Sequence, residues 1–240
     1  PAISKYADYI LVNNIEEKGV FPKKRTEVVY GAVDLEAINK YKKKYKNTPK
    51  TYDAVFQGRF HPQKGVVELI DIWRKIVDKN PKAKLAMIGD GPLMENVKLK
   101  IKKLHLENNI KLFGYVFDGD VKYKTFSQSK IVVHPALYDS GGMASAEAMA
   151  FGLPCVGFNL KSYESYYPHG MVKVKYNDLD EFAAVIMNLL TNSDYRIRIS
   201  NEAVKMIEND WSWDKRAEGV ITSLFDNHNS NKHSNVFVQK

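Results

Sequence analysis

The feature that most restricts the fold is an alternation of short apolar segments with amphipathic ones. Apolar runs bounded by turn residues predict strands, and apolar residues at helical spacing predict helices between them. The predicted strands are 52–58, 83–89, 109–116 and 129–135, with 153–159 and 170–175 as further candidates. The predicted helices are 66–80, 93–106, 120–128, 143–151 and 179–192. The order predicts an α/β fold: a doubly wound, mainly parallel sheet with helices on both faces, binding ligands at the carboxyl ends of its strands.

Composition narrows the class of partner. The formal net charge of +8 suits anionic ligands, although a Lys-rich run such as 41–50 is usually a solvated face. No nucleic-acid-binding motif accompanies the charge, so we expect no nucleic-acid partner. A single cysteine, Cys155, excludes an intramolecular disulfide and favours a reducing compartment. It lies in an apolar run, which predicts a buried, inert thiol. Neither a signal peptide nor a membrane span is visible, and we expect a cytoplasmic protein.

The loop 58–65, "GRFHPQKG", follows a predicted strand and opens a helix. Gly58 starts it, and it places Arg59 and Lys64 beside a helix N-terminus, where unpaired amides and the helix dipole favour an anion. A forked guanidinium and an ammonium together suit a diphosphate. The alternative is a surface turn whose two cations are only solvated.

The stretch 134–157 joins a strand end to the helix that starts near Met143. Glycines in Ser140-Gly141-Gly142 allow close approach of the backbone to a ligand, and the helix amides form an anion site. Glu147 suits a ribose diol, and Asp139 could reach a hexose hydroxyl. The alternative makes Glu147 a partner of the helix dipole and Asp139 a turn residue.

Two other strand ends carry weaker signals. Gly89 opens a tight turn that leaves room for a ligand, but the turn lacks the third glycine of a dinucleotide fingerprint. The backbone of Gly114, Tyr115 and Val116 could face a flat base. The DxD strings at 118–120 and 178–180 favour helix caps over metal ligands. No zinc-spaced His/Cys cluster is present, and we expect no metal.

Taken in order and spacing, these motifs resemble the retaining glycosyltransferases of the GT-B fold, family 4, over about residues 28–225. The resemblance rests on "GRFHPQKG", "MIGDGPL", "IKLFGYV", an acid-x7-acid pattern ending in "EAMAFGLPCV", and the closing "DWSWDKRAEGV". The sequence departs from the family pattern in two places. The first acid is Asp139 instead of Glu, and residues 30–34 read "YGAVD", where the family usually has "NG" before "VD".

The resemblance implies a role for each matched position. Arg59 and Lys64 would hold the donor diphosphate, and Glu147 would bind the ribose. The amides of Gly142, Met143 and Ala144 would contact phosphate and sugar, Gly114 to Val116 would frame the base, and Asp139 would face the donor sugar or its phosphate. No cofactor or metal is implied, because the cations stabilise the leaving diphosphate.

The resemblance also implies the organisation of the chain. Residues 1–34 would be a remnant of an N-terminal domain and hinge, and 35–225 the Rossmann-like, nucleotide-sugar-binding domain with its closing helix. Residues 226–240 are polar and predict a disordered tail. The missing N-terminal domain would bind the acceptor glycan or lipid-linked sugar, and the basic surface leaves peripheral association with the cytoplasmic membrane face open.

The implied activity is transfer of a sugar from a UDP- or GDP-sugar to an acceptor hydroxyl, with retention of configuration. Three alternatives stay open at this point. The chain could be a sugar-nucleotide epimerase or a phosphorylase of the same fold, or a non-catalytic nucleotide-sugar-binding module. The Asp139 departure is the feature that suggests the last of these.

Overall fold

A parallel six-stranded sheet forms the centre of the molecule in a computed structural model that describes residues 6–21 and 25–233, with side chains described as far as residue 223. The strand order is β5-β4-β3-β6-β7-β8, and every neighbouring pair is parallel. The strands are β3 (Tyr52–Gln57), β4 (Leu85–Ile88), β5 (Ile110–Gly114), β6 (Ser129–His134), β7 (Cys155–Phe158) and β8 (Met171–Val174). The predicted doubly wound α/β fold is confirmed.

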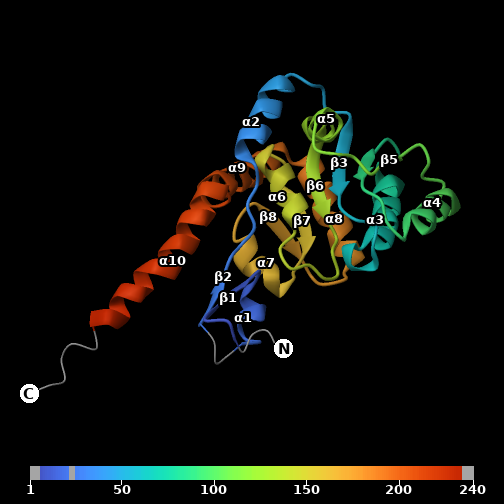
Figure 1. Cartoon of the computed structure of the whole chain (residues 1–240). Coiled ribbons are helices and arrows are strands. Elements are labelled where there is room, and N and C mark those ends of the chain that lie inside the picture. The colour runs from blue at the N-terminus through green and yellow to red at the C-terminus, as the bar shows by residue number, and fades with distance from the viewer. Residues whose placement is uncertain (1–5, 22–24, 234–240) are drawn as a thin grey trace, which may run out of the picture.

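Helices cover both faces of this sheet (Figure 1). Those on one face are α3 (Val66–Lys79), α4 (Met94–Lys103) and α8 (Leu179–Thr191), and those on the other are α2 (Leu35–Lys44), α5 (Asp120–Ser127), α6 (Met143–Ala150) and α9 (Ser193–Asp210). Successive residues of a strand point to opposite faces, so Ala54 and Phe56 of β3 join one apolar cluster and Val55 joins the other. Two buried layers therefore hold the sheet in place.

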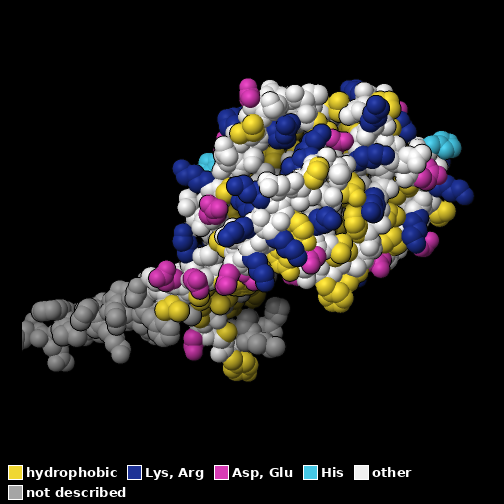
Figure 2. All heavy atoms as spheres, turned by 90° about the horizontal axis from the view of Figure 1, so that it is seen from above, with side chains coloured by type: hydrophobic (Ala, Val, Ile, Leu, Met, Phe, Trp, Pro, Cys, Tyr) yellow, Lys and Arg dark blue, Asp and Glu magenta, His cyan; other side chains and the backbone are white. Residues whose placement is uncertain are grey.

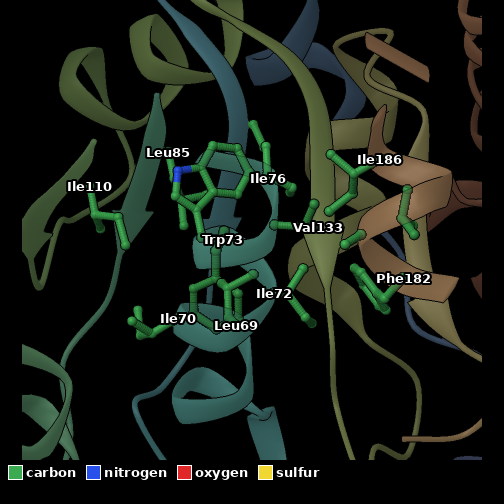
Figure 3. Packing of buried hydrophobic residues seen from close by; sticks show 14 of the residues in the cluster. Leu69, Ile70, Ile72, Trp73, Ile76, Leu85, Ile110, Val133, Phe182 and Ile186 are labelled. Carbon is green, nitrogen blue, oxygen red and sulfur yellow. The ribbon is translucent and has the colours of Figure 1, made fainter. Parts of the chain in front are cut away.

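The first layer is built around Trp73 of α3, which is fully buried (Figure 3). Leu69, Ile72 and Ile76 of the same helix lie around it and pack toward the sheet, and Phe182 of α8 closes the layer on the far side. The second layer contains Cys155, which is fully buried as predicted; burial raises the pKa of its thiol to about 12.

The order of the strands creates a switch point between β3 and β6. The chain runs from β3 outward to β4 and β5, then returns to β6 and continues outward on the other side to β7 and β8. In open parallel sheets the crevice at such a reversal, at the carboxyl ends of the strands, is where ligands bind. The loops that leave β3 and β6 are the two that the sequence predicted to bind an anion: residues 58–65, and residues 136–142 ahead of the helix that starts near Met143.

The described residues before 34 include a small two-stranded unit separate from the central sheet. Strands β1 (Tyr9–Val12) and β2 (Arg25–Val28) pair in parallel around the short helix α1 (Ile15–Lys18). The long helix α10 (Trp213–His233) runs beside this unit in Figure 1, and hydrogen bonds connect them. The Tyr9 hydroxyl is 2.8 Å from Ser223 Oγ, and Arg25 Nη2 donates to the Ser223 carbonyl at 2.8 Å.

Several elements differ from expectation. Helices α2, α7 (Lys161–Tyr166) and α9 were not predicted, and α10 continues through His233 into the stretch expected to be disordered from residue 226; residues 234–240 lie outside the described part. Asp178 caps α8 as predicted, accepting from the Glu181 amide at 2.9 Å. The cap prediction is wrong for Asp118 and Asp120, because Gly119 is the N-cap of α5.

The distribution of the basic side chains can be followed on one face of the molecule (Figure 2). Seen from above, Lys and Arg side chains are spread across the face instead of gathering in one patch (Figure 2). This distribution agrees with the interpretation of the Lys-rich segments as solvated faces. In the described part of the chain, none of the helices has the length and apolar content that crossing a bilayer requires.

Candidate functional site

A hollow of about 440 Å³ lies at the switch point between β3 and β6. The loop after β3 contributes Gly58, Arg59 and Lys64, and the loop after β6 contributes the segment from Asp139 to Ala144. The structure thus brings together two segments that are about eighty residues apart in the sequence, and it does so at the edge where parallel strands present their carboxyl ends.

A second hollow, of about 430 Å³, adjoins the first and shares Gln57, Gly58 and Arg59 with it. Its other walls include Gly89, Tyr115 and Val116, the residues predicted to leave room for a ligand and to frame a base. Gly114 ends β5 just before this wall and is not among the lining residues. Arg59 is exposed and stands at the boundary between the two hollows.

Lys64 is held in place by a short 3-10 turn over Pro62–Lys64. His61 caps this turn, and Gly65 ends it in the left-handed conformation before α3 begins. The Lys64 ammonium lies 2.5 Å from Asp139 Oδ2, and the side chain is 26% exposed. One of its three donors is therefore used by Asp139, which leaves the other donors for a ligand in the hollow.

Asp139, which was predicted to face the donor sugar or its phosphate, lines the first hollow, but most of the residue is buried. The residue is 9% exposed. Oδ2 receives Lys64 and His134 Nε2, the latter at 2.8 Å, and Oδ1 accepts the amides of Gly141 and Gly142 at 3.1 and 2.8 Å. Both oxygens are engaged, so this geometry favours the alternative in which Asp139 organises the turn.

The same contacts determine the protonation of Asp139. Burial of the carboxyl pushes its pKa upward, but the hydrogen bond from His134 and the positive charge of Lys64 outweigh burial. The pKa of Asp139 therefore lies well below its ordinary value of 3.8. At neutral pH the carboxylate is charged and neutralises Lys64 in part.

We expect Asp139→Asn to reduce the acid sensitivity of the fold. Because the folded pKa of Asp139 is depressed, its contribution to stability is present above pH 3.8 and is lost as the pH falls below that value. Between about pH 5 and pH 3 the wild type should lose about 1 kcal/mol more free energy of unfolding than Asp139→Asn. Urea denaturation at both pH values measures this difference, and identical losses would contradict it.

Two side chains, one in α7 and one directly after it, hold the glycine loop in place. The Tyr167 hydroxyl donates to the carbonyls of Gly141 and Gly142 at 3.1 and 2.6 Å, and Ser162 Oγ donates to the Asp139 carbonyl at 2.7 Å. Gly142 is the left-handed N-cap of α6 (φ 58°) and makes no side-chain cap. Its amide is already used by Asp139. The amides of Met143 and Ala144, in the first turn of α6 and lining the hollow, have no intrahelical acceptor.

Glu147 lies next to the two hollows without lining either of them. Its Oε2 atom accepts from Gln57 Nε2 at 3.0 Å and is 2.8 Å from Lys122 Nζ. The side chain is 22% exposed and lines a third hollow, of about 520 Å³, bordered by Tyr41 and Tyr123. Gln57, which lines the first two hollows, is the link between Glu147 and the predicted phosphate site.

Sequence reasoning missed four side chains around this site: Gln57, Lys122, His134 and Tyr166. Gln57 and His134 are the last residues of β3 and β6, so their position at the carboxyl ends of neighbouring strands was a usable signal. Lys122 and Tyr166 lie in helices, and no pattern in the sequence distinguishes them from other lysines and tyrosines. Tyr166 also donates to the Asn13 carbonyl at 2.5 Å, which connects the hollow to the N-terminal unit.

Comparison with known proteins identifies relatives of this arrangement. The family model described as "Glycosyl transferases group 1" matches residues 37–206. An uncharacterized glycosyltransferase of Methanocaldococcus jannaschii is 28% identical over 170 residues, which are 66% of this chain and 41% of the relative. The poly(glycerol-phosphate) alpha-glucosyltransferase of Bacillus subtilis is 26% identical over 161 residues, 65% of this chain and 23% of the relative. The chain spans less than half the length of these curated relatives.

Solved structures confirm the fold. HepE from Anabaena, in complex with UDP and glucose, superposes with a TM-score of 0.76 at 19% identity, over 92% of this chain and 64% of that one. A point mutant of S. aureus TarM, in complex with UDP and other ligands, gives a TM-score of 0.75 at 20% identity, over 90% of this chain and 43% of that one. At such identities the likeness establishes the architecture alone.

Proposed function

Because this chain belongs to the group 1 glycosyl transferases, we propose that it binds the sugar nucleotide of a glycosyl transfer reaction. In the complete protein, the sugar passes from a UDP- or GDP-sugar to an acceptor hydroxyl with retention of configuration. The acceptor, a glycan or a lipid-linked sugar, binds mainly to parts of the protein beyond this chain. The UDP named with HepE and TarM supports the donor class.

One observation carries the proposal: two cations and two free amides meet at the switch point of the sheet. Arg59 and Lys64 reach the first hollow from the loop after β3, and the amides of Met143 and Ala144 reach it from the start of α6. A diphosphate is the ligand that satisfies a guanidinium, an ammonium and a helix N-terminus together. The diphosphate therefore lies in the first hollow.

The remaining parts of the donor follow from this placement. The base enters the second hollow, which Tyr115, Val116 and Gly89 line. Gly89 has no side chain and therefore leaves room for the base. Gly58 and Arg59, shared by both hollows, lie between base and diphosphate. Glu147, held beside Gln57, provides carboxylate oxygen to the ribose hydroxyls. The sugar projects toward Ser140 and the glycine loop.

The chemistry of this geometry is charge stabilisation. As the bond between sugar and diphosphate breaks, negative charge grows on the leaving diphosphate. Arg59, Lys64 and the α6 amides then interact more strongly with the transition state than with the bound donor, which lowers the barrier. Asp139 acts indirectly: it holds Lys64 and the Gly141–Gly142 backbone at fixed positions.

Isothermal titration calorimetry with a panel of UDP- and GDP-sugars tests the proposal on the chain itself. We expect saturable binding of one nucleotide class, and at a hundredfold excess over Kd a stabilisation of about 2.7 kcal/mol in thermal unfolding. Lys98→Ala, which removes an exposed lysine paired with Glu95, is the matched control for Lys64→Ala. Absence of binding with every member of the panel would refute the proposal.

Activity of the complete protein separates the proposed function from its rivals. Product analysis by NMR should show a new glycosidic bond with the anomeric configuration of the donor. A free epimerised sugar nucleotide would indicate an epimerase, and a sugar phosphate a phosphorylase. Binding without any product would leave a non-catalytic module.

A further inference from the structure

Lys122 is a buried cation on a helix that the proposed donor does not touch. It lies in α5 with 2% of its side chain exposed. Lysine is almost never buried to this extent unless its charge is paired. The ammonium is 2.6 Å from Asp118 Oδ1 and 2.8 Å from Glu147 Oε2, and it lies 5.1 and 6.0 Å from the ring centroids of Tyr123 and Phe126. Two carboxylates and two aromatic rings thus surround the Lys122 ammonium.

The two acidic partners of Lys122 differ in how strongly the ion pair stabilises their charge. The Asp118 side chain is 74% exposed, so water can solvate its charge. The Glu147 side chain is 22% exposed and has less access to water. Since an ion pair matters more where solvent screening is weaker, the Lys122–Glu147 contact is the stronger constraint of the two.

The geometry at Glu147 separates its two oxygens. Oε2 receives Lys122 Nζ and Gln57 Nε2, one from α5 and the other from the end of β3. Two donors on one oxygen fix the plane of the carboxylate, and neither of them uses Oε1. The Oε1 atom is therefore the acceptor available for a ligand hydroxyl.

Lys122 is needed for a second reason, which is the charge of Glu147. The proposed ligand carries a diphosphate, and an uncompensated carboxylate at Glu147 would repel it. Lys122 supplies the compensating positive charge. Because it is buried and does not line the first hollow, it does not bind the phosphates in place of Arg59 or Lys64.

We propose that Lys122 is a positioning residue that orients Glu147 toward the ribose and thereby sets the preference of the site for ribonucleotides over 2′-deoxynucleotides. The inference rests on the proposed function, and it adds a residue that contacts no part of the donor. A purely structural lysine would affect stability and leave the sugar preference of the nucleotide unchanged.

Calorimetry of the purified chain with UDP, 2′-deoxy-UDP, GDP and 2′-deoxy-GDP tests it. For the nucleotide that the wild type binds, we expect the ribose form to bind about tenfold more tightly than the deoxy form, as for loss of one hydrogen bond to a charged group. In K122M the overall affinity should fall about tenfold, and the ribose preference should shrink to less than about threefold.

Three variants complete the design. K124M removes a lysine from the exposed side of the same helix and should behave as the wild type. K122R keeps the charge and should restore most of the ribose preference. D118N removes the other partner of Lys122 and should leave the preference intact. If K122M does not fold, K122A, which admits water to Glu147, is judged by the same ratio.

The outcomes separate the two claims. A wild type that binds no nucleotide overturns the proposed function, and this inference with it. A wild type that binds, together with a K122M or K122A variant that retains the tenfold ribose preference, overturns only the role of Lys122. A decline in affinity with an unchanged ratio would show a charge effect without positioning and would equally overturn the inference.

Discussion

Replacing Lys64 by alanine is expected to lower kcat/KM of the complete enzyme about a hundredfold, a loss of about 3 kcal/mol of transition-state stabilisation. The reason is that Lys64 and Arg59 are the cations that line the first hollow, the proposed place of the diphosphate, and the Lys64 side chain is 26% exposed. Charge grows on the diphosphate during the reaction, so kcat should fall more than KM rises.

The interpretation of this variant requires a control for Asp139. Removing Lys64 also frees a buried carboxylate, which would repel the diphosphate on its own account. The double variant Lys64→Ala/Asp139→Asn removes that repulsion, and activity that stays low in it assigns the loss to the missing cation. Initial-rate kinetics with the donor identified by calorimetry measures the effect. A Lys64→Ala enzyme within threefold of the wild type would contradict the proposed phosphate role.

Gly65→Ala is expected to reduce the free energy of unfolding by about 3 kcal/mol or more. Gly65 has a φ of 62°, and a side chain in this left-handed conformation costs about 1–2 kcal/mol. A Cβ atom there would also lie 1.8 Å from the carbonyl oxygen of Pro135, which is backbone and cannot rotate away. The loops after β3 and β6 would have to separate.

Gly114→Ala is the matched control, because Gly114 also has a positive φ but its Cβ would meet no clash. Gly114 has a φ of 70°, and no heavy atom lies within 4 Å of its ideal Cβ position. We expect this variant to lose about 1–2 kcal/mol, the strain alone. Urea denaturation of both variants measures the difference. Equal losses would show that the close approach of the two loops contributes nothing to stability.

The strands of the central sheet were predictable because their signal is local. A strand buried on both faces needs a run of apolar residues, and turn residues mark its ends, so β3, β4 and β6 could be read directly. The site loops followed, since parallel strands place their carboxyl ends on one edge. Helix α2 escaped prediction because four of its residues over 40–44 are lysines, and Ile38 is its one fully buried side chain among the described residues.

The role of Asp139 shows the limit of the motif. Its position eight residues before Glu147 predicts a ligand-facing acid. In the structure Asp139 lines the first hollow, and its two carboxylate oxygens are already engaged by His134, Lys64 and two backbone amides. The shorter side chain of Asp favours this, because it keeps the carboxylate close to its own turn. The sequence shows that Asp replaces the family's Glu at position 139, but it does not show that Asp139 lies next to Lys64.

The sequence by itself determined the class of fold, the places of the six central strands along the chain, and the loops that carry the cations. These features depend on residues that are neighbours in the sequence, because the local pattern of apolar and turn residues decides where strands and loops form. Only the tertiary structure decided which charges meet: Lys64 with Asp139, and Lys122 with Glu147. Such contacts join residues on different elements, and a shift of a few ångströms in packing would remove them, because the energy of an ion pair depends on distance and burial.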